Sequence, residues 1–124
     1  MAESVTIARP YAQAIFRLAK EGRSLAAWSD RLRRLAAIAA DPEMGNVVGN
    51  PKFSAGQSAD LFMALSGEPE NRELASFIAL LAENGRFDVL AEISAIFETL
   101  KSEDDGVQEA LIASAFPIDE AQLA

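Results

Sequence analysis

The sequence predicts an all-α protein, built as a compact bundle of six helices. Nearly every segment repeats its apolar residues with the period of an α-helix, and Gly, Pro, Asn and Ser gather in short stretches between these segments. The alternation of apolar and polar residues that is typical of strands is not apparent before residue 106. The 124 residues, half of them apolar, are enough for one modest hydrophobic core.

The expected boundaries of the helices follow from residues that start or stop helical backbone. We expect helices at about residues 4–21, 25–40, a short one from 42, then 55–66, 71–83 and 87–102. The starts and stops are Gly22, Ser24 as an N-cap, Asp41-Pro42 before the short helix, Ser54 with Gln57 as a capping box, and Asn84-Gly85 as a left-handed stop. The connections between helices are therefore short, as in helix bundles generally.

The single tryptophan, Trp28, marks the expected core. On a helical wheel with about 100° per residue, it falls on one side of the second helix together with Leu25, Leu32 and Leu35. The helix at 87–102 likewise confines its apolar residues to an arc of roughly 120°. Each of these helices therefore has one buried side.

The first helix has a wider apolar side, which covers roughly 200° of the wheel. Its apolar residues form two adjoining stripes. One stripe contains Ile7, Tyr11, Ala14 and Leu18, and the other contains Val5, Ala8, Ala12, Ile15, Phe16 and Ala19. A central place in the bundle would account for the width, and so would a surface that binds a partner. Pro10 falls on the polar arc, so we expect it to face water, at a slight bend or at a late start of the helix.

The fifth helix shows a similar surplus. Leu80 lies apart from the other apolar residues of this helix, among Glu73, Ser76, Glu83 and Asn84. A second helix with surplus apolar width suggests a groove that accepts an amphipathic helix. The predicted partner-helix groove consists of Ile7, Tyr11, Ala14 and Leu18 from the first helix and Ser76, Ala79, Leu80 and Glu83 from the fifth.

Charge and composition exclude several classes of function. Residues 1–62 hold eight Lys/Arg and six Asp/Glu, whereas residues 63–124 hold three and thirteen, so the net charge of −8 lies in the second half. Such a chain is repelled by phosphate backbones, which makes nucleic acid a poor partner. The acidic half suits either a basic partner or a solvated surface. The chain has no histidine and no cysteine, so it lacks the commonest general base, thiol nucleophiles and disulfides.

No catalytic, cofactor-binding or metal-binding residues stand out. The stretch GNVVGNPK resembles a phosphate loop, but Gly45 and Gly49 have three residues between them where that loop has four. The acidic run 103–105 with Glu109 lacks the spacing of a calcium loop, so it is expected to be solvated. An enzyme that uses two carboxylates remains the minority hypothesis, because no pair is singled out. No signal pattern or membrane-spanning run is found, which indicates a cytoplasm-like compartment.

The last segment differs from the bundle. EDDG at 103–106 interrupts the helical pattern, VQEALIASAFP has the length of a strand that stops at Pro117, and a further helix is expected to open at Asp119. We therefore divide the chain into a six-helix domain, residues 1–105, and the opening strand and helix of an incomplete C-terminal domain, residues 106–124. The bundle should fold without the last segment.

Three stretches and the single tryptophan carry a resemblance to a known family. TIARPYAQAIFRLA at 6–19, Trp28 in the second helix, LLAENGRFDVL at 80–90 and ASAFPIDEAQ at 113–122 resemble, in this order, the δ subunit of F-type ATP synthases. The mitochondrial counterpart is the oligomycin-sensitivity-conferring protein. The pair of ARPYA and AENGR, about seventy residues apart, is the specific part of the match. The resemblance implies a six-helix N-terminal domain and a second domain that is mostly missing here.

The resemblance also implies a function. The family is a non-catalytic stator link: its N-terminal domain binds the N-terminal helices of α subunits, and its C-terminal domain engages the b subunits of the peripheral stalk. It would need no cofactor and would meet the membrane only through the complex. We expect the protein to lie on the cytoplasmic side of a bacterial inner membrane, with the chloroplast stroma as the alternative location. The alternative function is an unrelated helical bundle that carries an apolar ligand or binds another amphipathic helix.

Overall fold

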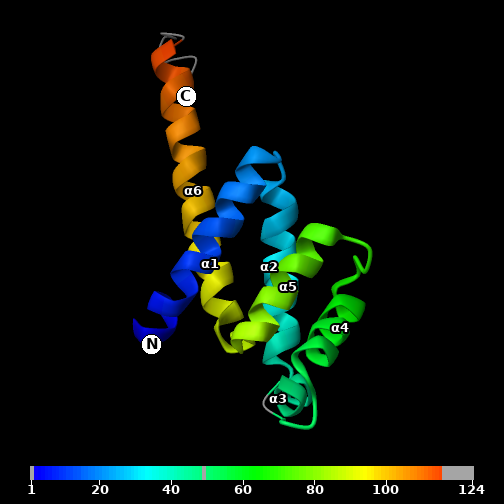
Figure 1. The fold of residues 1–124 in the computed structure, drawn as a ribbon. Coiled ribbons are helices and arrows are strands. Elements are labelled where there is room, and N and C mark those ends of the chain that lie inside the picture. Colours follow the sequence, from blue (N-terminus) through cyan, green and yellow to red (C-terminus); the bar gives the residue numbers. More distant parts are fainter. Residues whose placement is uncertain (1, 49, 116–124) are drawn as a thin grey trace.

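The computed structural model describes residues 2–48 and 50–115, and these are helices joined by short loops (Figure 1). No strand occurs in these two ranges. The elements, in chain order, are α1 (Ala2–Glu21), α2 (Leu25–Ala40), α3 (Pro42–Val48), α4 (Ala55–Ser66), α5 (Arg72–Asn84), a 3-10 turn η1 (Phe87–Val89) and α6 (Leu90–Ala115). The prediction of an all-α bundle with six α-helices is confirmed.

Most of the predicted caps are present. Ser54 Oγ accepts the backbone N–H of Gln57 at 3.1 Å, and Gln57 Oε1 accepts the N–H of Ser54 at 2.8 Å, which is the expected capping box of α4. Gly85 ends α5 in the left-handed conformation with φ +64°. Ser24 stands at the N-cap of α2, but its side chain does not cap the helix. Its hydroxyl instead lies 3.4 Å from the carbonyl oxygen of Ala19.

Pro10 lies inside α1 and is exposed, as the wheel predicts. The expectation of a late helix start is wrong, since α1 begins at Ala2. Pro10 has no backbone N–H to donate within the helix, but its exposed ring keeps it away from the packed side of α1.

The end of the sixth helix also differs from the prediction. α6 does not stop at residue 102 but continues through the acidic run and Gly106 to Ala115, so the strand expected from residue 107 is wrong up to that point. Glu, Gln, Leu and Ala are strong helix formers, and one glycine costs only about 1 kcal/mol relative to alanine. The helix expected at Asp119 and the stop at Pro117 lie outside the described residues. At its N-terminal end, the helix that we expected to begin at residue 87 starts with the 3-10 turn η1, and α6 follows from Leu90.

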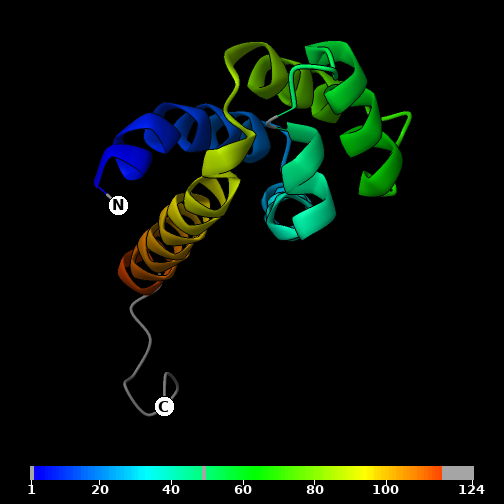
Figure 2. The same cartoon turned by 90° about the horizontal axis from the view of Figure 1, so that it is seen from below.

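The core is formed where α1, α2 and α6 pack on one another and where α4 and α5 pack as a pair. Figures 1 and 2 both show α4 and α5 together, on the side of the molecule away from the far end of α6. Trp28 is fully buried in this core, as predicted. Phe62 of α4 stacks on Phe87 of η1 with ring centroids 4.1 Å apart, and this contact joins the α4–α5 pair to the start of α6.

Candidate partner-helix groove

The two apolar stripes of α1 have different surroundings. Ala8, Ala12 and Ala19 are completely buried, and Ile15 is 6% exposed. In the other stripe, Ile7, Tyr11 and Leu18 are only partly buried and Ala14 is exposed. The middle of the stripe with Ala8 and Ala12 therefore belongs to the core, although Phe16 of that stripe is partly buried, whereas the stripe with Tyr11 and Leu18 lies at the edge of the core.

α5 presents the same division. Leu74, Phe77, Ile78 and Leu81 are buried, but Leu80 keeps 46% of its surface exposed and Ser76 is exposed. The prediction that Leu80 lies outside the core is confirmed. A single exposed leucine is ordinary, so Leu80 indicates a binding surface only if other apolar residues lie beside it.

The half-covered stripe of α1 and the exposed side of α5 face each other across an open groove of about 430 Å³. Its lining residues are Tyr11, Ala14, Ile15, Leu18, Glu73, Ser76, Phe77 and Leu80. Five of the eight residues predicted for a partner-helix groove are among them. Whether a helix binds there stays a prediction.

Three of the predicted residues are not part of this groove. Ile7 is partly buried and packs against the core. Ala79 and Glu83 line a separate hollow of about 100 Å³ together with Ala55 and Gly56 of α4. Side chains at these two positions of α5 turn toward α4, because a step of three residues changes the direction by about 60°.

Three groove residues were missed from the sequence. Ile15 and Phe77 are almost fully buried and form the floor, which explains why their pattern indicated core. Glu73 lies two turns before Leu80, so the heptad spacing from the misplaced leucine was the signal that could have found it. It is the only charged side chain among the residues that line the groove.

The floor of the groove rests directly on the core. The ring of Phe77 meets the indole of Trp28 edge to face, with centroids 6.0 Å apart and an interplanar angle of 88°. At one end, Asn84 Nδ2 donates to the hydroxyl oxygen of Tyr11 at 3.0 Å and connects α5 to α1. The floor of the groove is thus packed on the core, and its two walls are joined at one end by a hydrogen bond.

Comparison with known proteins shows the family. Residues 7–124 match the family described as the ATP synthase delta (OSCP) subunit. The chain belongs to this family. It is 47% identical over 123 residues to ATP synthase subunit delta of Nitrosospira multiformis, covering 99% of this chain and 69% of the relative. It is 52% identical over 124 residues to ATP synthase subunit delta of Aromatoleum aromaticum, covering 100% of this chain and 70% of the relative. The resemblance read from the three sequence stretches and Trp28 is confirmed.

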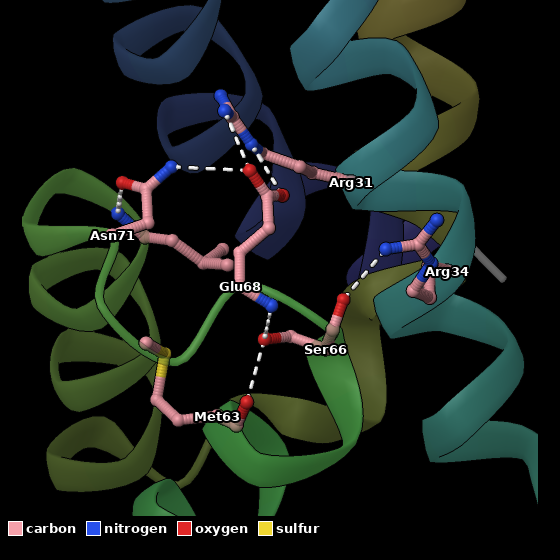
Figure 3. A network of polar contacts seen from close by, with 7 residues as sticks. Arg31, Arg34, Met63, Ser66, Glu68 and Asn71 are labelled. Atoms are coloured by element: carbon pink, nitrogen blue, oxygen red, sulfur yellow. Dashed lines mark hydrogen bonds and ion pairs between the residues drawn. The ribbon is translucent and has the colours of Figure 1, made fainter.

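This delta-family chain also has a polar network beside the groove, between α2 and the loop from α4 to α5 (Figure 3). Arg31 donates from Nε and Nη2 to the two carboxylate oxygens of Glu68 at 2.8 and 2.9 Å. These hydrogen bonds hold the pKa of Glu68 below its usual value, and the same contact raises the pKa of Arg31. The guanidinium also lies 5.0 Å above the Trp28 ring, so it is stacked as well as paired.

Elsewhere, the acidic run of this family member takes part in ion pairs. Asp104 lies 2.5 Å from Lys20 Nζ of α1, and Asp105 lies 3.7 Å from Lys101 Nζ. Within the described ranges, no three acidic side chains gather as a metal site would require. None of the helices described here is both long enough and apolar enough to span a bilayer.

Proposed function

We propose that this chain is a non-catalytic stator subunit of a bacterial F-type ATP synthase, and that the groove between α1 and α5 binds the N-terminal helix of an α subunit. The observation that carries the proposal is the open apolar groove with a buried floor on a member of the delta-subunit family. Apolar grooves between helices commonly accept the apolar face of an amphipathic helix.

The dimensions of the groove favour a helix as the bound partner. From Tyr11 to Leu18 the α1 wall spans two turns, about 10 Å, so a partner would place about two turns in it. Ala14 and Ser76 are small and allow the partner backbone to approach. Tyr11 and Leu80 are the large side chains that would anchor it. Glu73 adds one negative charge, which favours a partner with a cationic residue at that end.

The linker role extends this proposal to the complex. A stator must resist torque while the rotor turns, so the chain would hold the catalytic head at the groove and the b subunits through the region that follows residue 105. No cofactor is needed for such a role. The chain would lie on the cytoplasmic side of the inner membrane, or in the stroma if the source is a chloroplast, and would contact the membrane only through the complex.

The test is titration of the chain with a synthetic peptide that covers the N-terminal helix of an ATP synthase α subunit, measured by calorimetry. Tyr11→Ala and Leu80→Ala should each lower the affinity by roughly 5- to 30-fold, since truncation of an interface anchor costs about 1–2 kcal/mol or more. Ala14→Asp should weaken binding further, because it places a charge in a dry contact. Leu80→Ala and Ala14→Asp should melt within a few degrees of the parent protein, whereas Tyr11→Ala should melt somewhat lower because it also removes the hydrogen bond to Asn84.

Leu65→Ala is the matched control for Leu80→Ala. Leu65 lies on α4, outside the groove, and is 49% exposed, close to the 46% of Leu80. It should bind the peptide with unchanged affinity. Normal binding by all three groove variants, or an equal loss in the Leu65 variant, would show that the helix docks elsewhere.

A further inference from the structure

The backbone of α5 comes close to few elements outside its own hairpin, although its buried side chains belong to the common core. Its backbone packs chiefly against α4, whereas α1 faces it across the groove. One wall of the groove is therefore carried by the α4–α5 pair, and the other wall belongs to the tightly packed α1–α2–α6 part. Whatever fixes the pair against α2 also fixes the width of the groove.

The clearest attachment lies at the beginning of α5. Glu68, in the loop between α4 and α5, accepts two hydrogen bonds from Arg31 of α2. Its Oε1 also lies 3.5 Å from Nδ2 of Asn71, whose own Oδ1 caps α5 by accepting the N–H of Leu74 at 3.0 Å. The carboxylate of Glu68 thus contacts both α2, through Arg31, and Asn71, the residue that caps the start of α5 (Figure 3).

A second contact fixes the end of α4 beside it. Arg34 Nη1 donates to the carbonyl oxygen of Ser66 at 2.6 Å. Gly67 follows with φ +82°, and a Cβ at this position would lie 3.1 Å from that nitrogen. Only glycine combines this backbone conformation with so close an approach at no cost. The loop is therefore shaped to receive two arginines from successive turns of α2.

Arg31 is also connected to the floor of the groove, through Trp28. Its guanidinium stacks on Trp28, and Trp28 packs edge to face against Phe77, which lines the groove. The ion pair is thus connected to the groove by two routes: through Asn71 to the start of α5, and through Trp28 to the floor.

We propose that Arg31 and Glu68 are positioning residues for the groove: they set where α5 stands opposite α1 and therefore how wide the groove is. The hydrogen bond between Asn84 and Tyr11 holds the far end of α5, so loss of the ion pair should let the near end move. The consequence for partner binding rests on the function proposed above, but the effect on the position of α5 does not.

The first measurement reports the position of α5 without any partner. The chain has no cysteine, so spin labels can be attached at Gln13→Cys on α1 and Arg72→Cys on α5, both exposed. In Glu68→Gln and in Arg31→Lys, which keeps the positive charge but not the two-pronged geometry, the distance distribution between the labels should shift or broaden. A reference pair at Gln13 and Ser102, on α1 and α6, should not change. An unchanged distribution between α1 and α5 would overturn the proposal.

The second measurement is affinity for the same α-subunit peptide. Glu68→Gln and Arg31→Lys should weaken binding by roughly 2- to 30-fold, although neither residue lines the groove. Arg33→Gln is the control, because Arg33 lies on the same helix and pairs with Glu98 of α6 instead. It should alter neither the distances nor the affinity.

The two measurements separate the two proposals. If the distances change but the parent protein does not bind the peptide, the positioning role of the ion pair is supported and the α-subunit partner is wrong. If the distances change and the variants bind as tightly as the parent protein, the ion pair still positions α5, but the peptide docks outside the groove and the proposed partner site is overturned.

Discussion

The two apolar stripes of α1 are both made of apolar side chains, but they differ in how far they are buried. Ala8, Ala12 and Ala19 of one stripe are completely buried, whereas Tyr11 and Leu18 of the neighbouring stripe are only partly covered. The difference lies in the neighbours. α6 is the main packing partner of α1, and Phe16 meets Phe97 with ring centroids 5.9 Å apart.

On the other flank, α1 faces α5 across the groove. There an ion pair ties one end of α5 and a hydrogen bond ties the other, and the buried side chains of α5 enter the common core beneath the groove without packing continuously along α1. An apolar stripe thus becomes part of the core or stays open as a binding surface, depending on how closely a second helix approaches it. A stripe that its own chain leaves open remains available to a helix from another chain.

The same charge placed in each stripe should have very different effects on stability. Ala12→Asp should destabilise the protein by more than about 4 kcal/mol, because an unpaired buried charge costs several kcal/mol and the added volume costs roughly 1–3 kcal/mol more. Ala14→Asp, two residues away, should change the free energy of unfolding by less than about 1 kcal/mol. Urea denaturation measures both, and equal losses would mean that the stripes do not differ.

A second test concerns the layer beneath the groove. Trp28→Ala should cost about 3–5 kcal/mol, since the buried indole packs on Phe77 and leaves a large cavity when it is removed. Leu80→Ala, on the open side of α5, should cost less than about 1 kcal/mol by the same denaturation measurement. A Trp28→Ala protein with unchanged melting would contradict the assignment of this layer to the core.

The attachment of α5 predicts a dependence on pH. Arg31 holds the pKa of Glu68 below its usual value of 4.5 in the folded state, so the stabilisation is present above about pH 4.5 and is lost as the pH falls through the folded pKa. At pH 7, Glu68→Gln should cost about 0.2–1 kcal/mol, because both side chains are partly exposed. The difference from the parent protein should shrink on acidification.

Glu70→Gln is the matched control for this measurement. It removes the same charge two residues away in the same loop, and Glu70 forms no ion pair with the residues described here. Denaturation curves between pH 7 and pH 3 should show the convergence for Glu68→Gln only. Parallel curves for both variants would rule out a specific role for the pair.

The smallest expected effect concerns the end of the covered flank. A chain of residues 1–102 should still fold cooperatively, since the buried apolar residues all precede residue 98 in the described structure. It loses the ion pair between Lys20 and Asp104, which is worth about 0–1 kcal/mol because Lys20 is half exposed. Circular dichroism should show a helical protein with a slightly lower melting temperature, and Lys20→Gln in the full chain should reproduce most of the change. A disordered product would show that residues 103–124 contribute to the core.

Local signals in the sequence were sufficient for most of the elements. The capping box at Ser54 and Gln57, the left-handed stop at Gly85 and the burial of Trp28 all follow from residues within a few positions of one another. The family resemblance was readable for a similar reason, as it rests on short continuous stretches. The error at the end of α6 arose because EDDG was taken as a stop, although one glycine is too weak to end a helix of good helix formers.

The site depended on features that no local pattern contains. The sequence singled out Tyr11, Ala14, Leu18 and Leu80, but which stripe of α1 is covered depends on how closely α6 approaches it. The tertiary structure also decided that Glu73 faces the groove, that Ala79 turns toward α4, and that Arg31 meets Glu68, 37 residues later in the chain. Helical period and caps act within about one to two turns, whereas contacts between distant segments are decided only when whole helices pack.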